Sequence, residues 1–567
     1  MKKMKKVIAL ALATTSVFSA FAMASCGGSG GGGGEKVDVN RTQIYVNNYS
    51  GGYGVEWLTE IKKAYEKAQE NVCWEEGTEK KGVQIIINNT RPELAADSIL
   101  GNNDEVYFTE NVHYQALLAD NVFADITNAI TAKNPYDDDK TIVSKFKQQQ
   151  VDALNVGGKY YAIPHYEGAY GLIYNKELFD NKGYYLIQNI ADDTNVDDIT
   201  LSDYFDIRKT GENYTAGPDG KTGVIDGVDY SKDDGLPATY TEFFALCEWI
   251  SRRNDTPLLW TGKYRVLHLK SLLGTLLADY EGLDSMLASI NFDGTQVDSL
   301  GKIVNGKFTL DGESVEINES NGYDVSRRAG VYYALKFLKN VFGNEKYYNE
   351  KAFSDGYSHT DAQTDFVWGG YDGTPNYAML VDGEWWEEEA SDAFTAMVDY
   401  YDDTFAKTSR EFGWMPLPNA TSDKISQKDA LCDTRSAFAF VKANVNADKM
   451  PLITDFLQYV YADAKLEEFT KITGTLRALN YELSPTVLSE MSPFGRSLYE
   501  VKRKADVVYL TSTSTLFAMN QKTFEPSNAF VAQGDWKNPV DVLSGNVSVE
   551  DYFNSVGNYF KSLTIWG

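Results

Sequence analysis

Side chains able to bind a small polar molecule follow two of the expected strands. Residues 43–46 and 105–108 have strand character, and the groups behind them are Tyr49, Ser50 and Tyr53, and Glu110, Asn111 and His113. In open α/β sheets, ligands bind at the carboxyl edge of the strands. Aromatic rings there can stack on an apolar ring face, while carboxylates and amides hydrogen-bond to its polar rim. For the second group, a solvated loop is the competing interpretation.

Similar residue types occur in later segments that have the composition of loops. These residues are Trp260, Trp368, Tyr371 and Asp372. The run Trp-Gly-Gly-Tyr-Asp at 368–372 is hard to explain as core. Arg435 can donate two parallel hydrogen bonds to a pair of hydroxyls or to a carboxylate. A structural ion pair explains Arg435 equally well.

The sequence contains no pattern typical of catalysis or metal binding. It has no Gly-x-Ser-x-Gly, His-Glu-x-x-His or P-loop motif. Its four histidines are not paired at metal-ligand spacing, and the acidic runs 137–139 and 219–234 do not follow the calcium-loop pattern. We expect these runs to be solvated turns. Cys73, Cys247 and Cys432 are far apart, so buried thiols are expected rather than a zinc site or disulfides. No metal and no cofactor is predicted.

The N-terminus has the pattern of a secretory signal peptide. Four lysines within residues 2–6 precede an apolar run from Val7 to Met23. A single membrane anchor is the alternative, but the run is near the lower length limit and contains four hydroxyl side chains. Met23-Ala24-Ser25-Cys26 resembles the bacterial lipobox, which implies cleavage after residue 25 and lipidation of Cys26. Residues 26–37 then form a lipidated cysteine and a flexible glycine-rich linker, in which a tether of roughly 9 residues reaches on the order of 15–18 Å.

The charge balance excludes one class of partner. The chain has a net charge of −28, and the mature chain without the four signal-peptide lysines has −32. Such a surface repels phosphate backbones, so no nucleic acid is expected as a partner. It also offers no basic patch for anionic lipid, which leaves an acyl chain at Cys26 to hold the membrane.

The order of expected elements indicates an α/β protein of two or more domains. Strands at 43–46, 83–87 and 105–108 alternate with a helix at 55–67, which favours a mostly parallel sheet. Thr239 and Glu242 have the spacing of a capping box at the start of a helix over 239–252. A region rich in Asp, Gly and Thr, residues 195–237, reads as loop or a small insertion. Further helices are expected at 139–154, 267–289, 325–342, 447–473, 486–505 and 549–563.

Several segments resemble the extracellular solute-binding proteins of carbohydrate ABC importers, the group that contains maltose-binding protein. They are 158–164 with 172–179, Pro237–Phe243, Ala378–Trp385, Phe412–Pro418 and Asp455–Thr475. The match covers most of the mature chain. One departure is Leu476-Arg477, where the family's turn usually carries proline. The 195–235 insertion also lengthens the chain relative to compact members.

The resemblance implies a two-lobed periplasmic-binding-protein-like fold with a hinge and a ligand cleft between the lobes. One lobe takes residues 38–165 and 413–478, and the other takes 166–412 and 479–567. Trp385 is then expected to stack on a sugar, and Tyr166, Glu167 and Tyr170 are expected to line the cleft. A core tryptophan, or a buried strand with a surface carboxylate, would explain the same residues.

The resulting expectation is a lipid-anchored monomer on the outer face of a bacterial cytoplasmic membrane. It would capture a carbohydrate, most simply an oligosaccharide, and deliver it to an ABC permease without catalysis. A surface glycoside hydrolase and the same fold binding a peptide, polyamine or metal chelate are the alternatives. No motif places Glu167 and Glu384 at a catalytic separation.

Overall fold

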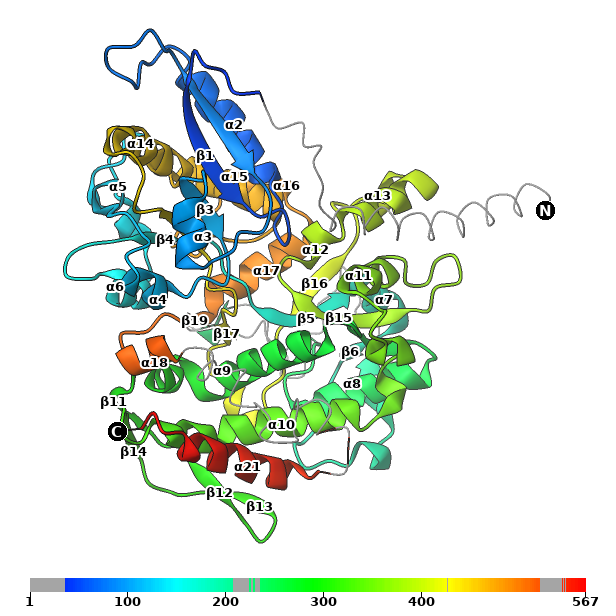
Figure 1. The fold of residues 1–567 in the computed structure, drawn as a ribbon. Coiled ribbons are helices and arrows are strands. Elements are labelled where there is room, and N and C mark those ends of the chain that lie inside the picture. Colours follow the sequence, from blue (N-terminus) through cyan, green and yellow to red (C-terminus); the bar gives the residue numbers. More distant parts are fainter. Residues whose placement is uncertain are drawn as a thin grey trace.

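The computed structural model describes residues 36–206, 224–225, 228–229, 235–425, 427–520, 543, 545 and 547–566. The signal peptide, Cys26 and most of the linker lie outside these residues, as does most of the 207–234 region. The described chain forms two lobes, each built around one mixed sheet (Figure 1). The expected two-lobed α/β architecture is therefore confirmed.

The first lobe has a five-stranded sheet in the order β2-β1-β3-β18-β4. β1 (Thr42–Asn48) is parallel to β2 (Val83–Asn88) and β3 (Val106–Thr109). β18 (Phe438–Val441) is antiparallel to β3 and to β4 (Ala162–Pro164), so only part of this sheet is parallel. Its helices are α2 (Glu56–Ala68), α3 (Ala96–Gly101), α4 (Tyr114–Ala119), α5 (Thr127–Thr131), α6 (Gln148–Leu154), α14 (Met450–Val460) and α15 (Asp463–Thr473).

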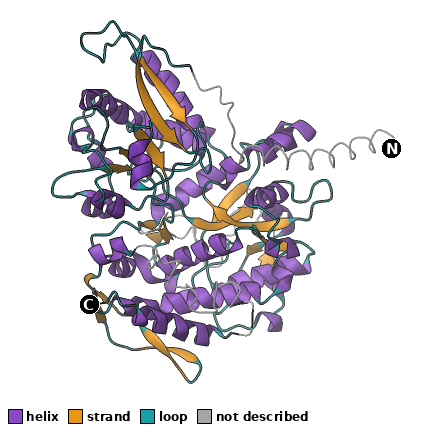
Figure 2. Cartoon of the chain, in the orientation of Figure 1, coloured by secondary structure: helices purple, strands orange, loops and turns teal. Residues whose placement is uncertain are grey.

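The second lobe has a four-stranded sheet in the order β10-β15-β5-β16. β10 (Thr256–Leu259) is parallel to β15 (Tyr377–Gly383), while β5 (Tyr170–Asn175) is antiparallel to β15 and to β16 (Phe412–Met415). Successive residues of β5 alternate between two cores, with Leu172 and Tyr174 in one and Ile173 in the other. Because both faces are covered, this sheet is buried, and Figure 2 shows the surrounding helices.

The second lobe is the more helical of the two. Its helices are α7 (Lys176–Lys182), α8 (Tyr240–Arg252), α9 (Arg265–Asn291), α10 (Ala329–Phe342), α11 (His359–Val367), α12 (Trp386–Glu389), α13 (Ser391–Tyr400), α17 (Pro493–Lys504), α18 (Thr515–Met519) and α21 (Val549–Ser562). The short helix α16 (Pro485–Glu490) packs instead against α15 of the first lobe. Small two-stranded sheets join β6 (Tyr185–Leu186) to β7 (Phe205–Asp206), β8 (Val224–Ile225) to β9 (Val228–Asp229), β11 (Asp293–Val297) to β14 (Val315–Asn318), β12 (Gly301–Val304) to β13 (Lys307–Leu310) and β17 (Ala430–Cys432) to β19 (Asp506–Val508).

One lobe boundary differs from the sequence-based expectation. The chain was expected to return to the first lobe at residue 413, but β16 at that position pairs with β5 in the second-lobe sheet. The return lies instead between Cys432 at the end of β17 and Phe438 at the start of β18. All four residues of β16 are buried, and a fully buried strand has the same pattern in either sheet.

The helix expected at 139–154 is also wrong in its length. A short 3-10 helix at Ile142–Lys145 and α6 are separated by extended backbone at Phe146 and Lys147. Asp137, expected in a solvated turn, is buried, and its carboxylate lies 2.5 Å from the Lys145 ammonium. The break thus accompanies a buried ion pair that the sequence pattern did not reveal.

One helix cap and the burial of two cysteines are confirmed, whereas the burial expected for a third cysteine is wrong. Thr239 and Glu242 form the expected capping box at the start of α8. Cys247 and Cys432 are buried as expected, but Cys73 is exposed, and none of the three forms a disulfide in the described structure. Among the described helices, none combines the length and apolar character needed to span a membrane.

Candidate functional site

Three segments cross between the lobes. They are residues 165–169 from β4 to β5, residues 433–437 from β17 to β18, and the connection from α15 to α17 that begins at Gly474. Gly168 donates its N–H to Asp433 Oδ1 at 3.1 Å, and Thr434 donates its N–H to the Gly168 carbonyl at 3.0 Å. The Ala478 N–H reaches the His165 carbonyl at 3.4 Å. The three crossings are therefore hydrogen-bonded side by side.

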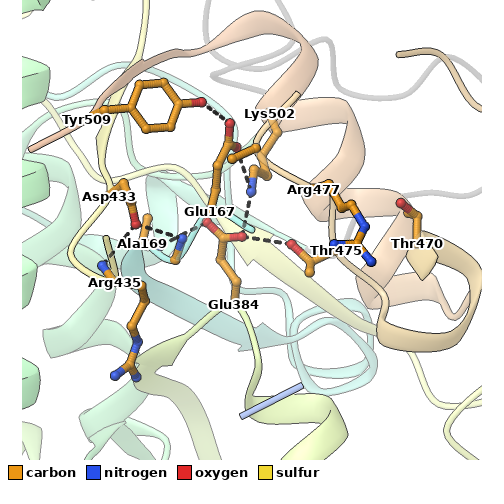
Figure 3. A network of polar contacts seen from close by, with 12 residues as sticks. Glu167, Ala169, Glu384, Asp433, Arg435, Thr470, Thr475, Arg477, Lys502 and Tyr509 are labelled. Carbon is orange, nitrogen blue, oxygen red and sulfur yellow. Dashed lines mark hydrogen bonds and ion pairs between the residues drawn. The ribbon is translucent and has the colours of Figure 1, made fainter. Parts of the chain in front are cut away.

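A buried ionic network joins these crossings (Figure 3). Glu167 accepts from Lys147 of the first lobe at 2.6 Å and lies 2.8 Å from Lys502 of α17. Lys502 also donates to Glu384 at 2.6 Å, and Glu384 accepts from Thr475 of the third crossing at 2.9 Å. The network therefore links both lobes, and all of its side chains except the partly exposed Lys147 are buried.

Two buried carboxyl groups at the crossings, those of Glu167 and Asp433, have pKa values shifted in opposite directions. Burial alone would raise the pKa of Glu167, but Lys147 and Lys502 outweigh it and hold the pKa at about 2. Burial raises the pKa of Asp433 to about 7, and the nearby Glu167 charge adds to the effect. Glu167 is thus a firmly ionised structural carboxylate, whereas Asp433 titrates near neutral pH.

Beside this network, an aromatic cluster surrounds Arg435. The guanidinium carbon of Arg435 lies 3.6 Å from the centroid of the Trp385 ring. Arg435 Nη2 donates to the Tyr170 hydroxyl at 3.3 Å, and Nη1 lies 3.6 Å from Glu110 Oε1. Trp385 is only 3% exposed. We call Trp385, Tyr170, Glu110 and Arg435 the Arg435 cage.

Residues of the first lobe close the cage on one side. The Tyr53 ring lies 4.6 Å from that of Tyr166 and 6.4 Å from that of Trp385. Tyr166 donates to Glu110 at 2.8 Å, and Tyr53 donates to the Glu167 carbonyl at 3.1 Å. The structure thus brings together seven of the residues singled out in the sequence: Tyr53, Glu110, Tyr166, Glu167, Tyr170, Trp385 and Arg435.

Four further candidates lie near this group without entering it. Tyr49 is half-buried below the Arg91 guanidinium, and Ser50 is exposed. Asn111 is exposed at a positive φ of 59°, and its N–H donates to the Arg435 carbonyl at 2.6 Å. His113 is half-buried just before α4. They border the cage on the first-lobe side.

The remaining four candidates lie elsewhere in the second lobe. Trp260 is fully buried, packs against Phe342 and Tyr348, and donates its indole N–H to the Ala352 carbonyl at 3.0 Å. The expectation of a ligand contact at Trp260 is therefore wrong, because its ring is packed in the core and its indole N–H already has a hydrogen-bond acceptor.

Trp368, Tyr371 and Asp372 form part of a surface cluster at the end of α13. Trp368 lies 5.8 Å from Tyr400, and Tyr371 lies 5.0 Å from Phe405. Asp372 is exposed in the left-handed region, with φ of 47°. These residues are not brought to the Arg435 cage.

Sequence reasoning missed the lysines that bind Glu167. Lys502 follows Phe494, Leu498 and Tyr499 on the buried face of α17, and a lysine at such a position signals a buried ion pair. Lys147 carries no comparable signal. Asp433 and Tyr509 were also missed as partners in the network; the Tyr509 hydroxyl contacts Glu167.

Two cavities near the crossings differ greatly in volume. The space beside Tyr53, Glu110 and Tyr166 is only about 10 Å³. A groove of about 440 Å³ opens on another side of the lobe junction, between α4, α6 and residues 512–519. Its lining has hydroxyls and amides but no aromatic ring. Among the described residues, no group of His, Cys, Asp and Glu could hold a metal ion.

The comparisons with known proteins come from structure alone. No protein-family model and no curated protein sequence matches this chain. A solved chitin oligosaccharide binding protein aligns with a TM-score of 0.52 and 13% identity, over 92% of this chain and 98% of that chain. The chain shares the fold of saccharide-binding proteins. RafE in complex with raffinose and the apo-form of RafE from Streptococcus pneumoniae also align, each with a TM-score of 0.52 and 14% identity, over 93% and 94% of this chain and 100% of each RafE chain. Two of these neighbours are described as binding proteins.

Proposed function

We propose that this protein is an extracellular solute-binding lipoprotein that captures a carbohydrate, most simply an oligosaccharide, for an ABC permease. One observation carries the proposal: aromatic and polar side chains from both lobes converge beside the crossing segments. Trp385 and Tyr170 come from the second lobe, and Tyr53 and Glu110 from the first. A ligand held between them contacts both lobes, so it stabilises the closed arrangement over an open one.

The remaining parts of the proposal follow from the sequence. A lipid at Cys26 anchors the protein as a monomer to the outer face of the membrane, and the glycine-rich linker allows the lobes to reach a permease. Tyr49, Ser50, Asn111 and His113 are proposed to contact the outer part of the ligand, because they border the cage.

Binding without catalysis is supported by the state of the two central glutamates. A glycosidase needs a protonated carboxyl group as general acid, with a raised pKa. Glu167 has the opposite property, with a pKa of about 2. Glu167 and Glu384 are both buried and share Lys502, which leaves neither in contact with a passing substrate.

A ligand screen by thermal unfolding tests the proposal. The panel contains raffinose, chitin oligosaccharides and other saccharides, together with peptides and polyamines. A ligand at 100 times its dissociation constant adds about 2.7 kcal/mol to the free energy of unfolding. We expect stabilisation by saccharides alone. Stabilisation only by peptides or amines would refute the sugar assignment, and product release from labelled oligosaccharides would refute binding without catalysis.

A further inference from the structure

The Arg435 side chain covers the ring face at which a saccharide would stack on Trp385. The guanidinium lies 3.6 Å from the ring centroid, which is contact distance for stacked planar groups. The indole also lies close to Gly383, where an added Cβ would be 2.1 Å from a ring atom, and Gly168 lies beside both Arg435 and the indole, where an added Cβ would be 2.2 Å from Arg435 Cγ and 3.3 Å from a ring atom. Tyr53 and Tyr170 approach the ring at interplanar angles near 90°. Arg435 therefore occupies a ring face on which a saccharide would stack.

Arg435 is held in this position by few and replaceable contacts. Its Nε has no hydrogen-bond partner, and its side chain retains 16% exposure. Its carboxylate partner Glu110 has three other contacts: Tyr166 at 2.8 Å, the Asn111 side chain at 3.1 Å and Arg91 at 3.3 Å. Glu110 therefore keeps its charge compensated when Arg435 moves away.

We infer that Arg435 is an internal competitor for the saccharide site, and that binding exchanges its guanidinium for the sugar ring on Trp385. This inference rests on the proposed function. The guanidinium plane and the apolar C–H face of a sugar can both stack on the indole, and both groups carry donors for the same acceptors. The backbone of Arg435 lies in the crossing at 433–437, so the exchange also couples the site to a segment that joins the lobes.

The exchange has a consequence for ligand class. The cage without the guanidinium keeps the Glu110 carboxylate, which lies 3.6 Å from Arg435. Burial lowers the pKa of Arg435, but nearby groups that include Glu110 and Glu389 outweigh it and raise the pKa above its ordinary value. Asp382 lies behind them, and a Gln363 amide bridges it to Glu389 at 3.0 Å from each. The site should therefore take neutral or amino saccharides and reject those that carry carboxylates.

The test compares wild-type protein with the Arg435→Ala variant. Isothermal titration with raffinose and a chitin oligosaccharide measures affinity. A cation–π contact of this kind corresponds to between about 2-fold and 30-fold in an equilibrium constant. We expect Arg435→Ala to bind the saccharide more tightly within that range, and glucuronic acid oligomers to bind neither protein.

A second readout follows Trp385 directly. In protein labelled with 5-fluorotryptophan, the Trp385→Phe variant assigns the ¹⁹F resonance, and its solvent isotope shift reports exposure of the ring. Arg435→Ala should increase this shift without saccharide. Arg91→Ala is the matched control, because it removes the other guanidinium paired with Glu110 and does not cover Trp385.

The possible results distinguish a failure of this inference from a failure of the proposed function. An unchanged ¹⁹F shift, or equal or weaker saccharide binding by Arg435→Ala, overturns the competitor role while the proposed function stands. If neither protein binds any saccharide, the proposed function fails and the inference fails with it. A folded Arg435→Ala protein is verified by its thermal unfolding profile.

Discussion

Two arginines near the crossings are both surrounded by aromatic rings, but their settings differ. The Arg477 guanidinium lies 4.2 Å from the Phe469 ring, 4.5 Å from Trp57 and 5.0 Å from Tyr461, and the residue is fully buried. These rings all belong to the first lobe. Arg435 contacts side chains of both lobes and is partly exposed. Figure 3 shows the two side chains on opposite sides of Glu384.

Their surroundings explain why Arg477 is a structural residue and why the Arg435 guanidinium can be exchanged. Arg477 donates to His165 Nδ1 at 2.6 Å and has no carboxylate within ion-pair distance in the described part of the chain. The surrounding aromatic rings shield the Arg477 guanidinium from water. Arg435 lies where the lobes meet and has a carboxylate that other groups also compensate. The same stacking chemistry thus fixes the third crossing to the first lobe at Arg477 and leaves the site adjustable at Arg435.

The largest effect is expected at Arg477. Arg477→Ala removes a fully buried large side chain, so the free energy of unfolding should fall by about 3–5 kcal/mol. Arg477→Met retains the volume without the unpaired N–H groups and should recover much of the loss. Arg435→Ala should cost about 1 kcal/mol or less. Denaturant unfolding measures the free energy of unfolding of all three variants. An equal loss for Arg477→Ala and Arg435→Ala would refute the proposed difference between the two arginines.

The next effect concerns Glu167, which lies between the two arginine sites. Its pKa is lowered from 4.5 to about 2, so its contribution is complete above pH 4.5 and is lost as the pH falls toward 2. Glu167→Gln should therefore cost about 3 kcal/mol at pH 7. Stability curves at pH 7 and pH 3 should show the difference from wild type shrinking; a constant difference would contradict the ionic role.

Asp433 should behave in the opposite sense and with a smaller effect. Its pKa is raised from 3.8 to about 7, so burying its charge costs stability progressively as the pH rises from 3.8 through 7. Asp433→Asn keeps the acceptor for the N–H groups of Gly168 and Arg435 and should gain about 1–2 kcal/mol at pH 8. No gain is expected at pH 3.5. A gain of equal size at both values would show that charge is not the cause.

The sequence predicted the fold better than the contacts at the site. Helix α2 and the capping box of α8 follow from local spacing, and both are present. The position of β16 was assigned to the wrong lobe, because burial of a strand does not say which sheet buries it. Trp260 and Trp368 both lie in segments with the composition of loops, yet Trp260 is in the core and Trp368 is half-exposed. Loop composition does not reveal which other segments pack against a side chain.

The cage itself depends on contacts between distant segments. Arg435 and Trp385 were both singled out, but their 3.6 Å stacking joins a crossing segment to a residue two positions after the end of β15. Periodicity reports which face of one element is buried and gives no pairing between elements. The lysines on Glu167 were missed for the same reason.

The most direct test of the central claim is a titration of the best saccharide from the thermal screen into two tryptophan variants. Trp385→Leu removes the flat ring at the lobe junction, and Trp368→Leu removes one from the surface cluster at the end of α13. If a saccharide binds between the lobes, Trp385→Leu should weaken binding by about tenfold or more, while Trp368→Leu should bind as wild type does. Equal affinity in both variants would contradict a site at Trp385.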